Sequence, residues 1–247
     1  MKRLIFNEDH EMFRDQVRKF MLAEAEPHRE QWRKDGCVDK EVFLKAGEQG
    51  LLCMWADEAY GGLGIKDFRF EQIVIEETMR NGDAGLFLTL HSRLVGPYIG
   101  HLGSEALKQR VLTKAVTGET ILGIAMTEPG AGSDLAGLKS RAVRDGDDWI
   151  LNGSKTYISN GINGGAFVVA ARTVPDKPHG IGLFVVEEGM EGFERGRNLA
   201  KMGLKSQDTA ELFFQNVRVP ADNVLGDPER GFYNLMHFLA EERLISA

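Results

Sequence analysis

Two stretches between residues 126 and 161 contain residue types that suit ligand binding. Pro129–Ser133 reads PGAGS, which has too little side chain to build a core and cannot form a helix interior. Small residues let the backbone approach a flat or phosphorylated ligand closely, with N–H groups free to donate. Tyr157 and Ser159 are two residues apart, so in a regular strand they share one face. A ring and a hydroxyl beside a small-residue loop predict a site for a planar heterocycle.

Glu242 is the second candidate, because it lies on the apolar stripe of a helical segment near the end of the chain. It follows Leu235 and Leu239 at helical spacing, which places its carboxylate on their face. A carboxylate that faces an interior must be paired, protonated or functional. Arg243 and His237 are its nearest possible partners. Spacing alone leaves open a buried ion pair, an apolar stripe that ends one residue early and a functional carboxylate.

The other candidates are less specific. The small-residue loop is neither a GxGxxG nor a P-loop motif, and Thr127 and Ser133 are common turn residues. His179 lies in a loop, where histidine is more often solvated than functional. Tyr233 is most simply a core or interface aromatic residue. Spacing therefore leaves both ligand binding and ordinary structural roles open for these residues.

Composition limits the class of protein. The 247 residues are 43% hydrophobic and 27% charged, as in a soluble globular protein, and the net charge of −7 argues against a general nucleic-acid binder. Cys37 and Cys53 form no CxxC, and the histidines form no HxxxH or HExxH, so we expect free thiols and no metal site. No targeting segment and no apolar run of membrane-spanning length is found, so we expect a cytoplasmic protein without membrane contacts.

The first part of the chain, residues 1–118, has apolar residues at helical spacing, which predicts an all-α domain. Capping residues, glycines and prolines mark its expected helix boundaries. The expected helices run from Asn7 to Pro27, from Asp39 to Gly50, through Phe70, Ile73, Val74 and Glu77 to Asn81-Gly82, over 84–102 with a kink at Pro97, and from Ser104 to Gly118.

Residues 119–229 change to short β-rich runs separated by turns, which predicts a compact barrel or sandwich. The expected strands are 121–126, 139–144, 149–151, 156–159, 167–172, 181–186 and 211–214. Asp145-Gly146-Asp147 is a turn signal, and Asn152-Gly153 predicts a hairpin. Helical spacing returns over 230–247 and reaches Ala247 without a stop signal, so we expect a further segment to be missing, or else a frayed terminal helix. The fold class is α+β.

Long motifs in this order resemble the acyl-CoA dehydrogenase family. TEPGAGSD at 127–134 and NGSKTYISNG at 152–161 are similar to its two flavin-site motifs, and KMGLKSQDTAELFF at 201–214 and the GFYNLM…ERL pattern at 231–244 resemble its long-chain branch. The resemblance implies an N-terminal α-helical domain (1–118), a small β-barrel-like middle domain (119–229) and the first helix of a C-terminal helical bundle (230–247), most of which the chain would lack.

The resemblance also implies FAD as the cofactor and assigns residues to it and to an acyl-CoA substrate. Ser159 would hydrogen-bond flavin N5 in place of the usual threonine, and Tyr157 would stack near the ring in place of a tryptophan. The implied flavin-binding residues are Ile124, Met126, Thr127, Gly132, Ser133, Tyr157, Ile158 and Ser159. The implied substrate-binding residues are Ser133, Pro178, His179, Tyr233, Ala240, Glu241, Glu242 and Arg243.

The implied reaction is the α,β-dehydrogenation of a fatty acyl-CoA to trans-2-enoyl-CoA in fatty acid β-oxidation. The long-chain and isovaleryl branches place the catalytic base immediately before an arginine on this helix, a pattern that Glu242-Arg243 fits. An electron-transfer flavoprotein would take the electrons, and the protein would form a dimer or tetramer. An acyl-CoA oxidase, a related flavin enzyme of the same fold and a non-catalytic remnant stay open as alternatives.

Overall fold

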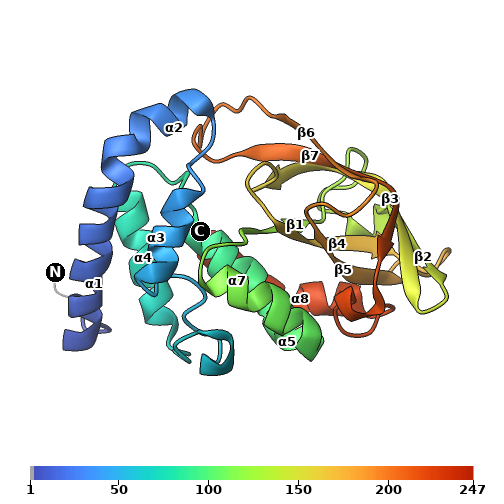
Figure 1. Cartoon of the computed structure of the whole chain (residues 1–247), viewed down its shortest axis with the longest axis horizontal. Helices are drawn as coiled ribbons and strands as arrows, with labels where there is room; N and C mark the ends of the chain where they lie inside the picture. The colour runs from blue at the N-terminus through green and yellow to red at the C-terminus, as the bar shows by residue number, and fades with distance from the viewer. Residues whose placement is uncertain (1–2, 247) are drawn as a thin grey trace.

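The computed structural model describes residues 3–246 and separates the chain into a helical part and a sheet (Figure 1). Helices occupy the chain up to Val116, strands follow between Leu122 and Val219, and a last helix, α8 (Gly231–Ser246), contacts both parts. The order of elements confirms the α+β class. Ala247, where the sequence predicts a missing segment, lies outside the described residues.

The helical part is built from short helices with several π and 3₁₀ turns. Its elements are α1 (Glu8–Phe20), η1 (Met21–Ala25), η2 (Glu26–His28), α2 (Arg29–Asp35), α3 (Glu41–Glu48), η3 (Glu58–Tyr60), α4 (Phe68–Arg80), η4 (Leu90–Val95), α5 (Gly96–Leu102), α6 (Glu105–Leu107), η5 (Lys108–Leu112) and α7 (Thr113–Val116). Short 3₁₀ turns, η6 (Leu135–Gly137) and η7 (Ala221–Asn223), lie within the sheet part.

The local helix signals were correct at some ends and wrong at others. Asn7 caps α1 by accepting from the backbone N–H of His10, and Ser104 caps α6 by accepting from that of Leu107. Pro27 does not end the helical run, because it lies at the start of the turn η2, where its missing N–H costs no hydrogen bond. Asp39 does not cap α3, because it accepts instead from the indole N–H of Trp32.

The strands form one curled mixed sheet of seven strands, which agrees with the barrel-like prediction rather than with a sandwich. Its order is β1-β4-β2-β3-β7-β6, and β5 pairs with β4. The strands are β1 (Leu122–Ala125), β2 (Arg141–Asp145), β3 (Asp148–Ser159), β4 (Ala166–Arg172), β5 (Ile181–Glu187), β6 (Phe193–Asn198) and β7 (Thr209–Val219). Only β1 with β4 and the short contact of β2 with β4 are parallel.

The hairpin predicted at Asn152-Gly153 is wrong. The chain runs straight through this dipeptide as the single strand β3, with a register shift against β7 between Leu151 and Gly153. A β-bulge explains both the glycine and the misleading turn signal. Gly153 has a φ of 148°, and a Cβ there would lie 2.2 Å from Oγ of Ser140. The true hairpin joins β2 to β3 at the predicted Gly146-Asp147 turn.

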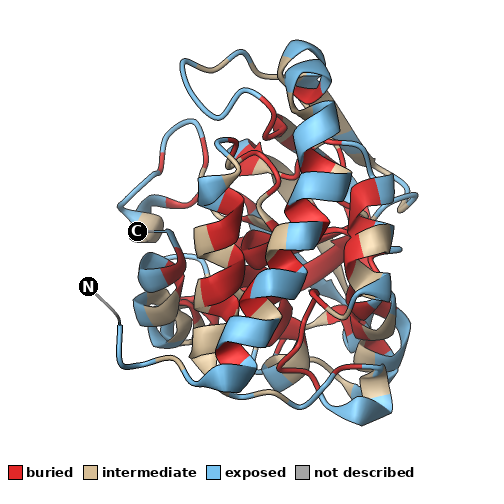
Figure 2. Cartoon of the chain, turned by 90° about the vertical axis from the view of Figure 1, so that its left-hand side faces the viewer, coloured by how far each residue is buried: buried red, intermediate tan, exposed pale blue. Residues whose placement is uncertain are grey.

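The helical part packs against the sheet through shared apolar residues. Figure 2, which views the molecule from the helical side, shows helices that are exposed on their outer faces and buried where they face inward. One core cluster joins residues of η4 and α5, such as Tyr98, to strand residues such as Val168 and Leu183 and to Leu235 of α8. The last helix is therefore part of the same core as the sheet.

His91 of η4 ties the helical part to β1. Its Nδ1 accepts from the backbone N–H of Leu122 at 3.0 Å, and its Nε2 lies 3.0 Å from the carbonyl oxygen of Ala115. The side chain is fully buried, which lowers the pKa of its imidazole to about 4. The neutral ring can therefore accept at one nitrogen and donate at the other.

Two buried glutamates of α4 are in contrasting surroundings. Glu77 receives hydrogen bonds from Arg14 and Arg18, and these partners outweigh burial and lower the pKa of its carboxyl. Glu71 has neither carboxyl oxygen hydrogen-bonded. Burial raises the pKa of Glu71 to about 8. The positive charge of Arg93 opposes this rise, and the negative charge of Glu241 adds to it.

We predict that Glu71→Gln removes a pH dependence of stability. Since the pKa of Glu71 rises on folding from 4.5 to about 8, its contribution to stability is complete below pH 4.5 and is lost as the pH rises through 8. The unfolding free energy of the variant relative to wild type should increase by about 1.4 kcal/mol per pH unit in this window. Urea unfolding at several pH values measures it. Parallel curves for the two proteins would contradict the prediction, and Glu77→Gln should instead destabilise throughout.

Candidate functional site

The small-residue stretch forms a tight loop directly after β1. Glu128 and Ala131 exchange backbone hydrogen bonds of 2.9 and 3.1 Å, which closes the turn. A Cβ atom added at Gly130 or at Gly132 would meet no other atom within 4 Å, so both glycines border open space. The loop therefore presents backbone rather than side chains to its surroundings.

A buried ion pair connects this loop to β3. Nζ of Lys155 donates to Oε1 of Glu128 at 2.9 Å and to the carbonyl oxygen of Met126 at 3.0 Å, and Lys155 is fully buried. The Glu128 carboxylate also accepts from the backbone N–H groups of Lys139 and Ser140 at 2.7 and 3.0 Å. One carboxylate thus fixes both ends of the loop against β3.

The pair is charged at neutral pH because each partner stabilises the other. Burial lowers the pKa of Lys155 to about 8, and the attraction of Glu128 opposes this shift. Burial also acts to raise the pKa of Glu128, but Lys155 and the backbone donors outweigh it and hold the pKa of that carboxyl below its usual value.

The second stretch departs from a regular strand at Tyr157. Tyr157 has a φ of 58°, and the pairing of β3 with β7 shifts register between Lys155 and Ile158. The prediction that Tyr157 and Ser159 share one face assumed regular alternation, which this bulge interrupts. Tyr157 is 70% exposed, an unusual position for an aromatic ring, whereas Ser159 is half-buried.

Glu242 is buried on α8, as the apolar stripe predicts, but neither Arg243 nor His237 is its partner. Its Oε1 accepts a hydrogen bond from the hydroxyl of Tyr98 on α5. Burial raises the pKa of the Glu242 carboxyl, and the hydrogen bond from Tyr98 opposes the rise. A base with a raised pKa is better matched to proton abstraction near neutral pH.

The loop and α8 face each other across a cleft of about 390 Å³. Seven residues proposed from the sequence line it, and they come from three separate segments. They are Met126, Thr127, Gly132, Ser133, His179, Glu242 and Arg243. The ring of His179 stacks on Phe232 of α8, with centroids 4.1 Å apart, which connects the segment before β5 to this helix.

The remaining candidate residues lie outside this lining. Ile158 is buried in the sheet core, Tyr233 packs edge-on against His179, and Glu241 forms an ion pair with Arg93 of η4. The other residues outside the lining are Ile124, Tyr157, Ser159, Pro178 and Ala240.

Sequence reasoning did not identify several residues of this region. Asp134, Leu135, Ala136, Phe232, Leu235, Met236 and Leu239 complete the cleft lining. The apolar members on α8 were visible as its stripe, but a stripe does not reveal whether it faces core or cleft. Glu128 and Lys155 were also missed, although a charged residue within a small-residue motif is a signal that could have found them, and no local signal indicated Tyr98.

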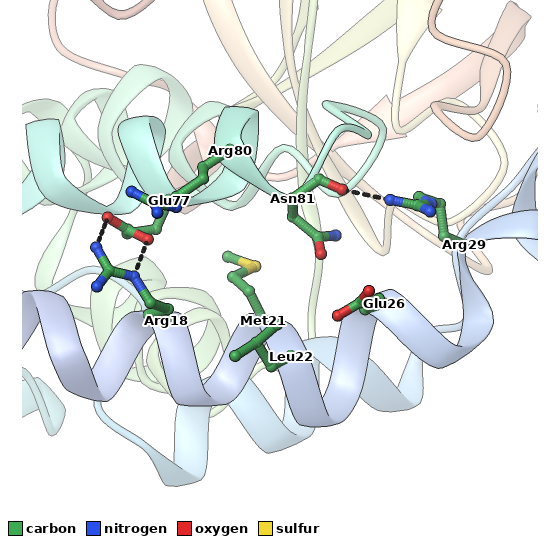
Figure 3. Close-up of a pocket in the computed structure, with 8 residues that line it drawn as sticks. All are labelled: Arg18, Met21, Leu22, Glu26, Arg29, Glu77, Arg80 and Asn81. Carbon is green, nitrogen blue, oxygen red and sulfur yellow. Dashed lines mark hydrogen bonds and ion pairs between the residues drawn. The ribbon is translucent and has the colours of Figure 1, made fainter.

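A second cavity, between α1 with η1 and α4, has a volume of about 300 Å³ (Figure 3). Arg18 is held on Glu77 there by two hydrogen bonds of 2.9 Å, and Arg29 donates to the carbonyl oxygen of Asn81. Arg18 and Glu77 are thus engaged with each other, and neither small-residue motif reaches this cavity. The cleft at Glu242 is the better candidate on chemical grounds.

The described part of the chain, residues 3–246, contains no group of three or more His, Cys, Asp or Glu side chains placed to hold a metal ion. It also contains no helix with the length and apolar character needed to cross a membrane.

A helical part, a curled mixed sheet and a cleft between a small-residue loop and a buried glutamate define an acyl-CoA dehydrogenase-like fold. The family model for the N-terminal domain of acyl-CoA dehydrogenases matches residues 7–119, and that for the middle domain matches residues 123–217. The chain therefore belongs to the acyl-CoA dehydrogenase family.

Individual members of this family are similar to the chain in sequence and in structure. The chain is 48% identical to the long-chain specific acyl-CoA dehydrogenase, mitochondrial, of Sus scrofa, over 99% of the chain and 57% of that protein. The crystal structure of an acyl-CoA dehydrogenase from Geobacillus kaustophilus is 50% identical, with a TM-score of 0.95 over 99% of the chain and 65% of that structure. A glutaryl-CoA dehydrogenase from Mycobacterium smegmatis in complex with FADH2 is 31% identical, with a TM-score of 0.88 over 97% and 61%. The chain thus spans about 57% of the length of the Sus scrofa relative.

We predict that Lys155→Met destabilises the fold by about 3–5 kcal/mol, because it leaves the buried Glu128 carboxylate without its cation. Arg218→Met is the matched control, since the pair of Arg218 with Asp145 is exposed and should change stability by at most about 1 kcal/mol. Urea unfolding measures both effects. Adding Glu128→Gln to Lys155→Met should recover part of the loss, and a loss no larger than that of the control would contradict the role of the pair.

Proposed function

We propose that this chain provides the flavin and acyl-CoA sites of an FAD-dependent acyl-CoA dehydrogenase that converts a fatty acyl-CoA to trans-2-enoyl-CoA in β-oxidation. The observation that carries the proposal is the buried carboxylate of Glu242, which lines one cleft with Gly132 and Ser133 of the small-residue loop. The cleft thus has a carboxylate base on one wall and, on the other, a loop that exposes its backbone. This arrangement suits an acyl-CoA thioester held against a planar electron acceptor.

The described residues fit FAD. Gly132 leaves open space where a side chain would otherwise obstruct a pyrophosphate, and the exposed ring of Tyr157 offers a surface for stacking. We assign the cofactor to eight residues: Ile124, Met126, Thr127, Gly132, Ser133, Tyr157, Ile158 and Ser159. When bound, FAD supplies a two-electron acceptor for the hydride that leaves the β-carbon.

Glu242 has the role of base in this proposal. Its carboxylate takes the α-proton while the α and β C–H bonds break and the C=C bond forms, so a proton and a hydride leave together. The buried site weakens the solvation of the carboxylate and strengthens it as a base. Phe232, Leu235 and Leu239 line the same cleft and offer an apolar wall that excludes water.

We assign the CoA thioester to the substrate-binding set predicted from the sequence: Ser133, Pro178, His179, Tyr233, Ala240, Glu241, Glu242 and Arg243. His179, from the segment before β5, and Arg243 of α8 line the same cleft as Glu242, which supports this assignment. We further propose an electron-transfer flavoprotein as the electron acceptor and a dimer or tetramer as the assembly.

Glu242→Gln should slow the substrate-driven bleaching of bound FAD by about a hundred- to ten-thousandfold, because the amide cannot take the α-proton. FAD binding should be unchanged. Glu105→Gln is the matched control, since Glu105 also accepts a hydrogen bond from a tyrosine, Tyr60, but at the exposed surface and away from the cleft. Stopped-flow absorbance after addition of an acyl-CoA measures the rate.

Other results of the same assay would replace the proposal. Normal bleaching in Glu242→Gln would assign the base to another residue. Oxygen consumption with substrate and no other acceptor would indicate an acyl-CoA oxidase. Protein that stays colourless after addition of FAD would support a non-catalytic chain.

Gly132→Leu should weaken FAD binding by about tenfold or more, a loss of about 1.4 kcal/mol, because its side chain would enter the cleft. Folding stability should hardly change, since a Cβ at this position meets nothing within 4 Å. Gly130→Leu is the control, because Gly130 is equally open but does not line the cleft. Quenching of flavin fluorescence measures affinity, and equal affinities of the two variants would refute the assignment of Gly132.

A further inference from the structure

Tyr98 occupies a position that packing alone does not explain. It lies on α5, is fully buried, and its ring packs on Phe238 of α8 with centroids 4.5 Å apart. An apolar residue would satisfy this environment, yet the position holds a phenol. The hydroxyl donates its hydrogen bond to Oε1 of Glu242.

Glu242 lies between two spaces. It lines the large cleft with Gly132 and Ser133, and it also lines a smaller cavity of about 40 Å³ between α8 and the η4–α5 segment, with Arg93, His101 and Phe238. A free carboxylate at such a junction has more than one side-chain orientation available, and only one of them serves the cleft. A donor that holds one oxygen removes this freedom.

We propose that Tyr98 is the positioning residue of Glu242, holding one carboxylate oxygen from the α5 side while Glu242 remains part of the cleft wall. The inference rests on the proposed function, in which Glu242 is the base. Tyr98 does not line the cleft and acts only through Glu242.

The same hydrogen bond opposes the effect of burial on the base. Donation to the carboxylate favours its charged form, whereas burial favours the neutral form. Other titratable or charged groups line the two spaces that Glu242 borders. They are Arg93, His101, Asp134, His179, Glu241 and Arg243. Arg93 is engaged by Glu241, so Tyr98 is the partner that contacts Glu242 directly.

The test is the variant Tyr98→Phe, which keeps the ring and removes the donor. The pKa of Glu242 should rise by about 1 to 2 pH units, the range expected for losing a hydrogen bond to a charged group. Titration of ¹³C-carboxyl-labelled glutamate by NMR measures it on the full chain, and the resonance missing in Glu242→Gln identifies the signal. Tyr60→Phe is the matched control, because Tyr60 also donates to a glutamate, Glu105, but at the exposed surface.

A second measurement covers the case in which Tyr98→Phe does not fold. Replacing the four tyrosines with 3-fluorotyrosine makes the phenol a stronger donor, so the pKa of Glu242 should fall. An unchanged pKa of Glu242 in Tyr98→Phe, or in the fluorinated protein, would overturn the inference.

The activity assay separates this inference from the proposed function. If the FAD-loaded protein dehydrogenates an acyl-CoA, the acidic limb of its kcat/KM profile should shift upward in Tyr98→Phe, and an unshifted limb would overturn the positioning role. If no dehydrogenation occurs, the proposed function fails, while the NMR titration still decides whether Tyr98 controls Glu242.

Discussion

The ion pair between Glu128 and Lys155 is the interaction on which the site depends. It is almost completely buried, so it stabilises the fold only while both partners and their hydrogen bonds are in place. The carboxylate gathers Lys155 with the backbone of Lys139 and Ser140, and Lys155 in turn holds the carbonyl oxygen of Met126. A loop of glycine, alanine and serine has little side chain with which to hold its own shape. The pair provides the rigidity that the loop lacks and leaves its outer face open.

On the opposite wall of the cleft, the buried carboxyl of Glu242 has no cation as its partner among the described residues. Glu128 is neutralised by a cation, whereas within residues 3–246 the carboxyl of Glu242 has a neutral phenol as its one hydrogen-bond partner. A salt bridge would hold the pKa of Glu242 low and weaken it as a base, while a carboxyl without any partner would be protonated more readily. A single neutral hydrogen-bond donor has an effect on the pKa of Glu242 that lies between these two cases. Two buried glutamates near one cleft therefore differ in the direction of their pKa shifts because their partners differ in charge.

The sequence predicted the class of fold and both walls of the site, because these depend on local patterns and long motifs. Helical spacing located α1, α4 and α8, and the stripe of α8 placed Glu242 on a buried face. The pairing of Glu128 with Lys155 across 27 positions, and of Tyr98 with Glu242 across 144, is set by tertiary packing and has no local signal. The hairpin error at Asn152-Gly153 has the same origin. The dipeptide permits a turn, but here Gly153 forms a β-bulge instead, because Ser140 packs too close to it for any side chain to fit.

The contact of His91 with β1 has a consequence for association between molecules. In the described chain β1 has one strand neighbour, β4, so its other edge would be free to recruit a strand from a second chain. That edge is occupied by side chains instead. His91 accepts from the N–H of Leu122, and the amide of Asn160 donates to the carbonyl oxygen of the same residue at 2.8 Å. The histidine that joins the two parts of the molecule thus also protects the sheet against edge-to-edge aggregation.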